Sequence, residues 1–472
     1  MNTAEDESDG LDELRRRLIA ETLANAPSRA APAGIIRPTD RGVDLPLSSA
    51  QERMWFSQNL TGRSRFHVLD LAYRVDTALD QDALQAALDA VVERHEVLRT
   101  SIVSVDGIPV QRVAAPSKVS VEWHHTAASD ALALRLTDEF VQRPFDVTAP
   151  PLIRAGVWSH SNDTLFILTV PHLVCDALSA DILVSEVVDA YRLRCRGESL
   201  ALQPLDVQFG DYAAWQRTKL EPARIADLLA HWTTRLTESP VVSVPTDYAR
   251  PSLPSGRGGV VQVRLSCVVR GDLERLAGEH DATPFMVLLA AYFVVLSQWS
   301  GQDDIVVGTP SAGRTEAELS GLVGMFVDTL PIRLSIARGS SFREVLSEIR
   351  ARVLDAFDHQ ELPFEQIVRA LNCERDLSRH PIFQIWFVLQ GETRALELPG
   401  GTTFVPVEIE RDEVVSPFDI SLMVTPANGE FRCDFTYARE LFDPTTIEQM
   451  AALFTQVVET ATKHPDTLVS QL

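Results

Sequence analysis

Apolar residues along the chain alternate between short continuous runs, typical of strands, and spaced positions that line one face of a helix. The run 165–168 is rich in strand-forming residues, and positions 182–184 and 187–188 follow with helical spacing. The stretch 169–177 lies between them, where a strand is predicted to end and a loop to begin. Binding and catalytic side chains are often displayed at such junctions, so we take this stretch as the centre of the chain's organisation.

His172 and Asp176 are the two residues of this stretch with suitable chemistry. A histidine at such a junction can exchange a proton near neutral pH. The aspartate can instead fix the loop, by accepting hydrogen bonds or by pairing with an arginine from elsewhere in the chain. A histidine and an aspartate four residues apart occur by chance in many proteins, so this pair alone does not define a catalytic site.

The first half of the chain predicts a mixed α/β structure rather than a strict βαβ repeat. Ser48 or Ser49 is placed to cap a helix that carries residues 54–56. The elements predicted after this helix are a strand over 68–75, a helix over 83–92, and strands around 102–103 and 110–113 that an Asp106-Gly107 turn separates.

The second half begins with a helical connection through residues 209–232 and a proline- and glycine-rich crossing over 245–256. The run 285–296 is the longest apolar run, yet it is too short to span a bilayer, so it indicates a buried helix. The other elements predicted in this half are a strand over 260–265, a helix over 273–277 and a strand over 305–308.

Length and charge narrow the class of protein. A chain of 472 residues exceeds what a single core usually supports, so we expect two domains or two intimately packed lobes. The net charge of -23, with no basic block to offset it, argues against binding to nucleic acid or to an anionic membrane surface.

Residues 1–40 form a leader in which 11–23 has the pattern of a short amphipathic helix. Such a helix docks onto the body or onto a partner chain, or is a frayed end without a role. The amino terminus lacks the basic and apolar regions of a signal peptide, which predicts a cytoplasmic protein.

The five cysteines are widely scattered, odd in number and without paired metal-ligand spacing. We therefore interpret them as reduced thiols of a cytosolic protein. Cys175 lies inside the central stretch, but between Val174 and Asp176 it has no positive neighbour to lower its pKa. We interpret it as a small packing residue rather than a nucleophile.

Seven stretches, read together and in order, resemble the condensation domains of nonribosomal peptide synthetases. The resemblance extends from residue 45 to the end of the chain. The stretches are 47–56, 94–100, 170–177, 209–215, 323–330, 359–364 and 375–390. Within them, 48–56 and 94–100 resemble in particular the subgroup that joins two L-configured aminoacyl units.

The resemblance implies an α/β fold of two chloramphenicol-acetyltransferase-like lobes, which form a V-shaped pseudo-dimer around a central tunnel. We place the N-terminal lobe at 41–215 and the C-terminal lobe at 216–472. Donor and acceptor carrier proteins are expected to reach the tunnel from opposite faces, each with a phosphopantetheine arm. The chain is expected to be a monomer that binds no metal or diffusible cofactor, and its leader is a candidate contact with other synthetase subunits.

His172 matches the second histidine of the family's His-His-x-x-x-Asp-Gly motif, near which an acyl thioester meets the acceptor amine. An amine that attacks a thioester must lose a proton, and a neutral imidazole can accept this proton or orient the amine. Asp176 matches the motif aspartate, which implies a structural ion pair with an arginine. The candidates for this arginine are Arg94 and Arg99.

Two positions depart from the motif. Pro171 occupies the position of the motif's first histidine, so any hydrogen bond that a histidine side chain makes there is absent. Ala177 stands at the terminal glycine, where a glycine serves either a left-handed backbone or the close passage of a pantetheine arm. The added methyl group predicts strain in the first case and a narrower passage in the second. Asp328 stands where the family usually has asparagine, and it adds a negative charge beside the lobe interface.

These departures leave three functional hypotheses. We favour an amide-forming enzyme with altered substrate preference, because His172 and Asp176 are both retained. The second is an acyltransferase that uses a hydroxyl or a freely diffusing amine as acceptor. The third is a catalytically silent domain that docks carrier proteins or tailoring enzymes. The candidate tunnel positions, of which Phe326 and Trp386 are better explained by packing, are Gly324, Phe326, Asp328, Gln384 and Trp386.

Overall fold

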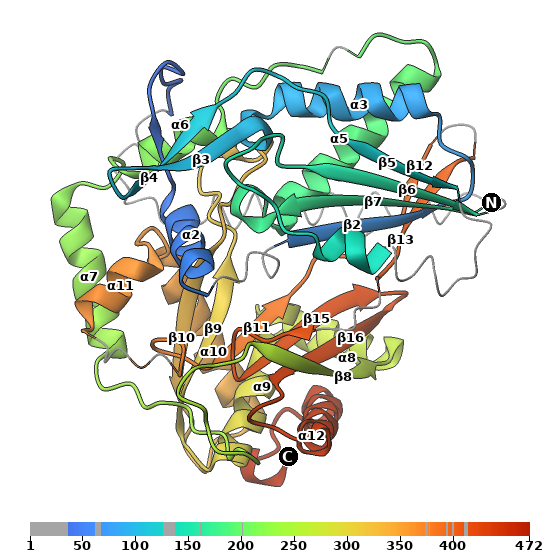
Figure 1. Cartoon of the computed structure of the whole chain (residues 1–472). Coiled ribbons are helices and arrows are strands. Elements are labelled where there is room, and N and C mark those ends of the chain that lie inside the picture. Colours follow the sequence, from blue (N-terminus) through green and yellow to red (C-terminus); the bar gives the residue numbers. More distant parts are fainter. Residues whose placement is uncertain are drawn as a thin grey trace. The chain divides into compact units, whose positions relative to one another are not determined.

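A computed structural model describes most of the unit Ile36–Leu472. Figure 1 shows the whole chain. The predicted leader helix over 11–23 lies outside the described residues, as do Cys373 and Arg375. The described residues are 36–61, 68–125, 137–160, 163–200, 202–372, 376, 378–392, 395–398, 401–409 and 414–472.

The described strands form three sheets. Their orders are β1-β4-β3, β12-β13-β2-β7-β6-β5 and β10-β9-β11-β15-β16-β8-β14. The strand bounds are β1 (Leu45–Pro46), β2 (Val68–Val75), β3 (Thr100–Val105), β4 (Ile108–Val113), β5 (Val121–His125), β6 (Arg154–His160), β7 (Asp163–Pro171), β8 (Arg257–Leu265), β9 (Asp304–Ser311), β10 (Asp328–Ser335), β11 (Ile385–Leu389), β12 (Leu396–Glu397), β13 (Thr403–Pro406), β14 (Val414–Val415), β15 (Ile420–Ala427) and β16 (Glu430–Ala438).

Helices pack on the sheets and connect them (Figure 1). The α-helix bounds are α2 (Ser49–Thr61), α3 (Gln81–Arg94), α5 (Ala177–Cys195), α6 (Phe209–Gln216), α7 (Pro222–Leu236), α8 (Cys267–Glu279), α9 (Pro284–Ser300), α10 (Phe342–Asp358), α11 (Phe364–Ala370) and α12 (Pro444–Lys463). Four short 3₁₀ helices among the described residues are η2 (Glu96–Arg99), η3 (His172–Val174), η4 (Ala317–Leu319) and η5 (Val469–Gln471).

The six-stranded sheet carries the central stretch at the end of β7. Successive side chains of a strand point to opposite faces of its sheet. Accordingly, Phe166, Leu168 and Val170 lie in the core that α3 and α5 complete, whereas Ile167 packs in a smaller cluster on the other face. Only Cys175 and Asp176 separate η3 from α5, so the strand before His172 and the helix after it together fix its position.

The seven-stranded sheet packs against the most apolar helix among the described residues, α9. All its residues from 286 to 296 are buried, as expected for a helix that is apolar on every side. Thr283 caps its amino end, and Gly301, with a φ of 69°, ends it in the left-handed conformation that favours glycine. Among the described helices, none alone is long and apolar enough to cross a membrane; α8 and α9 meet that test as a pair, but they are bent by 103°.

One segment from late in the chain joins the six-stranded sheet. Strand β13 pairs antiparallel with β2, with Phe404 opposite Val75. The buried ring of Phe404 lies 6.2 Å from that of Phe166, centroid to centroid, at 88°. The predicted division at residue 216 therefore separates β13 from the strand with which it pairs. Four residues of β13 carry no local signal of their distant partner, because pairing between strands is decided by tertiary packing.

Most predicted elements are present. The strand over 68–75 is β2, and the Asp106-Gly107 turn joins β3 to β4 with a positive φ at both residues. Ser48 is the residue that caps α2, because its Oγ accepts a hydrogen bond from the Gln51 main-chain nitrogen at 3.2 Å. The helix predicted over 273–277 is the second half of α8, whose first residues lack helical periodicity in the sequence.

Candidate active site

His172 is half-buried at the point where β7 ends. Its Nδ1 lies 2.8 Å from the main-chain oxygen of Cys175. A carbonyl oxygen accepts hydrogen bonds and cannot donate them, so Nδ1 carries the proton and the lone pair of the neutral ring is on Nε2. Burial, with a smaller contribution from the charge of Arg53, lowers the pKa of His172 below 6.5. The ring is therefore neutral at physiological pH and can act as a base.

Asp176 holds the loop that follows His172. Its carboxylate, which is 1% exposed, caps α5 by accepting a hydrogen bond from the main-chain nitrogen of Ser179 at 2.8 Å. The other carboxylate oxygen accepts one from the main-chain nitrogen of Phe326 at 3.0 Å. The main-chain nitrogen of Asp176 donates to the oxygen of Gly324 at 3.0 Å. These bonds join the motif to a loop that lies 150 residues further along the chain.

Arg314 is the arginine that pairs with Asp176. Its Nη2 lies 3.4 Å from Asp176 Oδ1 and donates to the Ser179 hydroxyl oxygen at 2.7 Å. The guanidinium also lies 4.1 Å above the ring centroid of Phe326. We refer to this group as the Asp176 clamp; its members are Asp176, Ser179, Arg314, Gly324 and Phe326.

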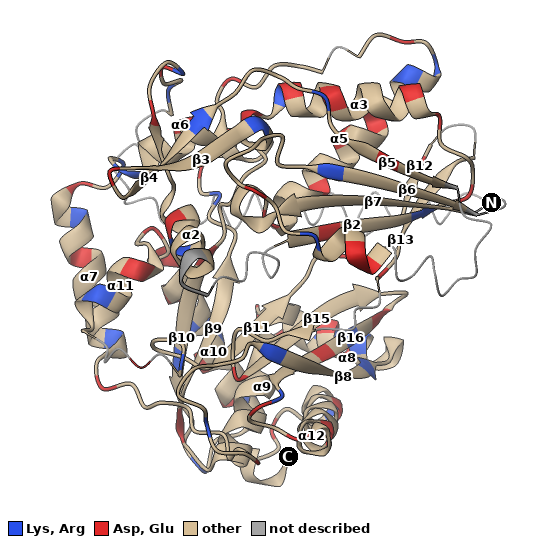
Figure 2. Cartoon of the chain, in the orientation of Figure 1, with Lys and Arg blue, Asp and Glu red and all other residues tan. Residues whose placement is uncertain are grey.

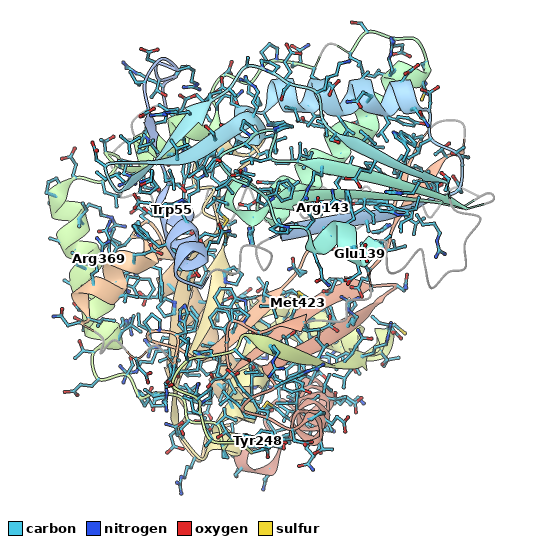
Figure 3. All side chains as sticks on the ribbon, in the orientation of Figure 1. Trp55, Glu139, Arg143, Tyr248, Arg369 and Met423 are labelled. Carbon is cyan, nitrogen blue, oxygen red and sulfur yellow. The ribbon has the colours of Figure 1, made fainter. Side chains whose placement is uncertain are left out.

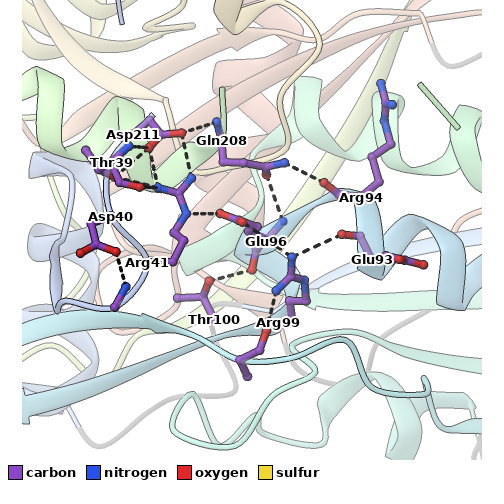
Figure 4. Close-up of polar contacts among 12 residues, drawn as sticks. Thr39, Asp40, Arg41, Glu93, Arg94, Glu96, Arg99, Thr100, Gln208 and Asp211 are labelled. Atoms are coloured by element: carbon purple, nitrogen blue, oxygen red, sulfur yellow. Dashed lines mark hydrogen bonds and ion pairs between the residues drawn. The ribbon is translucent and has the colours of Figure 1, made fainter. Parts of the chain in front are cut away.

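The two predicted partners of Asp176 are wrong. Arg94 pairs with Glu186 on α5 at 3.1 Å, and Arg99 lies 3.7 Å from Glu96. Figure 4 shows both arginines within a separate polar network at the end of α3. The positions of Arg94 and Arg99 in the sequence do not indicate whether their side chains face the motif. In the fold, both side chains point toward acidic residues close to them instead.

The two motif departures are accommodated locally. Pro171 has φ and ψ of -66° and 133°, which are extended values that a proline adopts without strain. Ala177 is the exposed first residue of α5 and does not have a positive φ. The strain expected from a left-handed backbone at Ala177 is therefore absent. The narrower passage for a pantetheine arm stays a prediction.

Gly324 and Phe326 pack inside the clamp. A Cβ atom on Gly324 would lie 1.9 Å from a ring carbon of Phe209, so this position has no room for a side chain. Phe326 is 2% exposed, and its ring meets that of Phe209 edge-on at 5.0 Å. For Phe326 the packing interpretation agrees with the structure.

Asp328 forms an ion pair with a residue that sequence reasoning did not single out. Arg53 on α2 donates from Nη1 to Asp328 Oδ1 and to Glu365 Oε1, each at 3.0 Å. One guanidinium thus bridges two carboxylates from β10 and α11. The extra negative charge predicted at Asp328 is present, but it is paired.

An open cavity of about 640 Å³ lies beside Arg53 and is lined by residues of α2, α6, α7 and α11. Its apolar lining includes Phe56, Leu220 and Ile225. Figure 2 shows basic and acidic residues interspersed on α7 and α11. Arg369 on α11 also lines the cavity, is exposed, and has no ion-pair partner among the described residues; Figure 3 labels it. The cavity therefore offers apolar surface and an available cation.

Gln384 and Trp386 belong to an aromatic cluster beside β11. The Gln384 side chain is buried, and its Nε2 donates to the main-chain oxygen of His380 at 3.1 Å. Trp386 stacks on Phe418, with ring centroids 5.0 Å apart at 5°. Among the described residues, no hydrogen bond, ion pair or ring contact joins Gln384 or Trp386 to His172, and their tunnel role stays a prediction.

Cys175 is fully buried, and burial raises the pKa of its thiol well above 9.0. It is a packing residue, as expected. The described cysteines are all free thiols: Cys175, Cys195, Cys267 and Cys433.

The chain matches the family model of the condensation domain over residues 43–472. It therefore belongs to the condensation-domain family. Among its relatives, tyrocidine synthase 3 of Brevibacillus parabrevis is 36% identical over 450 residues, and malpinin synthetase of Mortierella alpina is 36% identical over 420. These matches cover 95% and 88% of this chain, but 7% and 5% of the two synthetases. The chain thus spans less than a tenth of these relatives.

A solved structure with the same fold is the X-domain from teicoplanin biosynthesis. It is 26% identical, with a TM-score of 0.82, and the match covers 93% of this chain and 99% of that one. The X-domain is also known in complex with OxyB from the same biosynthesis. The expected α/β class with chloramphenicol-acetyltransferase-like lobes is confirmed, and so is the membership in nonribosomal peptide synthetase condensation domains. The subgroup that joins two L-configured units stays a prediction.

Proposed function

We propose that this domain condenses an acyl or peptidyl thioester, held on a donor carrier protein, with the amine of an aminoacyl acceptor carrier protein. The product is an amide bond. The observation that carries the proposal is the state of His172: its Nδ1 proton is fixed by the Cys175 carbonyl, and its neutral Nε2 is left to accept a proton.

The reaction balances with this one base. The acceptor amine forms a bond to the thioester carbonyl carbon, and its excess proton passes to Nε2 of His172. The tetrahedral intermediate then breaks its carbon–sulfur bond, and the departing thiolate takes the proton back. A positioned base of this kind contributes roughly 10²–10⁴-fold to the rate, and holding both substrates on tethered arms supplies much of the remainder.

The cavity beside Arg53 supports the use of a carrier arm. A phosphopantetheine arm combines a phosphate with a long uncharged chain. The exposed guanidinium of Arg369 suits the phosphate, and the lining by Phe56, Leu220 and Ile225 suits the chain. Under this proposal the substrates arrive on carrier proteins, and the domain itself binds no cofactor. Its monomeric state and cytoplasmic location stay predictions.

The test mixes the protein with donor-loaded and amine-loaded carrier proteins and measures intact mass. We expect a new amide-linked mass whose rate of formation falls roughly 10²–10⁴-fold in His172→Ala. His280→Ala, on a histidine outside the candidate active site, is the matched control and should retain the wild-type rate. Equal rates in His172→Ala and wild type would contradict the proposed base.

A second candidate function is a docking domain without catalysis. Two observations favour it: the similarity to the X-domain, which is known in complex with OxyB, and the departures at Pro171 and Ala177. In that case carrier proteins or a tailoring enzyme bind this domain, and wild-type protein forms no product with any amine or hydroxyl acceptor. Measurement of carrier binding alongside product formation separates the two functions.

A further inference from the structure

A second group of histidines lies outside the candidate active site. His231 comes from α7, Asp355 from the last turn of α10, and His359 from the residue that ends α10. Asp355 and His359 are four residues apart, which places their side chains on the same side of the helix end. The two imidazole rings stack face to face, with centroids 3.5 Å apart at 5°.

The spacing around the carboxylate is unusual. His231 Nε2 lies 3.6 Å from Asp355 Oδ2, and His359 Nδ1 lies 3.7 Å from Asp355 Oδ1. Both distances are too long for hydrogen bonds. Ligand atoms that share a tetrahedral Zn²⁺ at about 2.0–2.1 Å are roughly 3.4 Å from one another. The separations are thus close to those that a shared metal ion imposes.

An unpartnered ring nitrogen also suits a metal. His231 Nε2 is buried and has no hydrogen-bond partner among the described residues. Imidazole nitrogen and carboxylate oxygen are ligands that zinc takes in proteins. The side chains of His359 and Asp355 are 25% and 29% exposed, which leaves an approach for the ion and for water ligands.

Two contacts have to change when an ion binds. Arg235 Nη2 lies 3.0 Å from Asp355 Oδ2. His359 Nδ1 donates to the main-chain oxygen of Asp355 at 2.7 Å, so its proton has to move to Nε2 before Nδ1 can bind the ion. The Arg235 side chain is 41% exposed, so it can turn into solvent. The rings also have to turn from their parallel stack so that both lone pairs converge.

We propose that His231, Asp355 and His359 bind a divalent transition-metal ion of the zinc class, which fastens α7 to the end of α10. This site lies next to the cavity, because Ile225 of α7 and Pro363 after α10 both line that cavity. The metal thereby holds two parts of the cavity wall together. The proposal does not depend on condensation activity.

The test titrates the chelator-treated 472-residue chain with ZnCl₂ and follows binding by calorimetry and the midpoint of thermal unfolding. We expect one equivalent to bind and to raise the midpoint. His231→Gln and His359→Gln should each weaken affinity at least tenfold, whereas His280→Gln should leave it unchanged. An affinity that is unchanged in either of the first two variants, or no stoichiometric binding by wild type, would overturn the proposal.

Arg235→Gln separates metal binding from general damage to the fold. Removal of the competing cation should tighten Zn²⁺ binding several-fold, which a merely disturbed structure would not do. Weaker binding by Arg235→Gln would overturn the proposed geometry. Circular dichroism of each variant shows whether the fold is retained.

Discussion

Two histidine-bearing regions of the molecule differ in how the carboxylate beside the histidine is held. At His172 the ring is held by a main-chain oxygen, and the loop after it is tied down by the buried carboxylate of Asp176. The rings of His231 and His359 stack on each other, and His359 also donates to a main-chain oxygen. The side-chain carboxylate of Asp355 is out of hydrogen-bond range of both ring nitrogens. The first arrangement holds a base in position before any substrate binds. The second leaves side-chain atoms that can become ligands of a metal ion.

The largest effect on stability should come from removing the buried carboxylate of the Asp176 clamp. Asp176→Ala removes the cap of α5 and leaves Arg314, which is 8% exposed, without its counter-charge. We expect the free energy of unfolding to fall by about 3–5 kcal/mol. Asp355→Ala, in metal-free buffer, removes a carboxylate that is 29% exposed and should cost about 1 kcal/mol or less. Urea unfolding of both variants measures the contrast, and equal losses would refute it.

A smaller loss is expected from crowding the same clamp without removing a charge. In Gly324→Ala the new Cβ would lie 1.9 Å from a ring carbon of Phe209, whose side chain is buried. We expect a loss of about 1–3 kcal/mol in urea unfolding. Gly321→Ala is the matched control, since nothing lies within 4 Å of its Cβ position, and it should stay within about 0.5 kcal/mol of wild type. Similar losses in both variants would mean that the clamp is not tightly packed.

The smallest effect is a change in pH dependence. The folded-state pKa of His172 is lowered below 6.5, so the neutral base is present above that pH and is lost as the pH falls through the folded pKa. Arg53→Gln removes a charge that contributes to this lowering. The acid limb of the profile of kcat/KM against pH should therefore move to higher pH in Arg53→Gln. Arg338→Gln, on a side chain that is 87% exposed, should leave the limb in place, and a shift to lower pH in Arg53→Gln would contradict the assignment.

Local pattern predicted most of the elements and the position of His172. The apolar run before it and the helical spacing after it are each contained within about ten residues, and β7 and α5 occupy these places. A helix cap at Ser48 or Ser49 and the Asp106-Gly107 turn were predictable for the same reason, since both depend on neighbouring residues.

What the sequence did not reveal depends on residues far apart in the chain. Arg314 is 138 residues from Asp176, and Arg53 is 275 from Asp328. No spacing rule connects such pairs, because tertiary packing alone decides which arginine faces which carboxylate. The group of His231, Asp355 and His359 was missed in the same way. Asp355 and His359 are four residues apart at the end of α10, but His231 comes from α7, and tertiary packing alone brings it to them.

Strand β13 limits how such domains can be exchanged between synthetases. It comes from beyond residue 400, yet its partner β2 ends at Val75. A recombination breakpoint near residue 216 would give the six-stranded sheet a strand from one parent and its hydrogen-bonded neighbour from the other. Chimeras that keep 36–472 from a single parent keep this strand pairing intact.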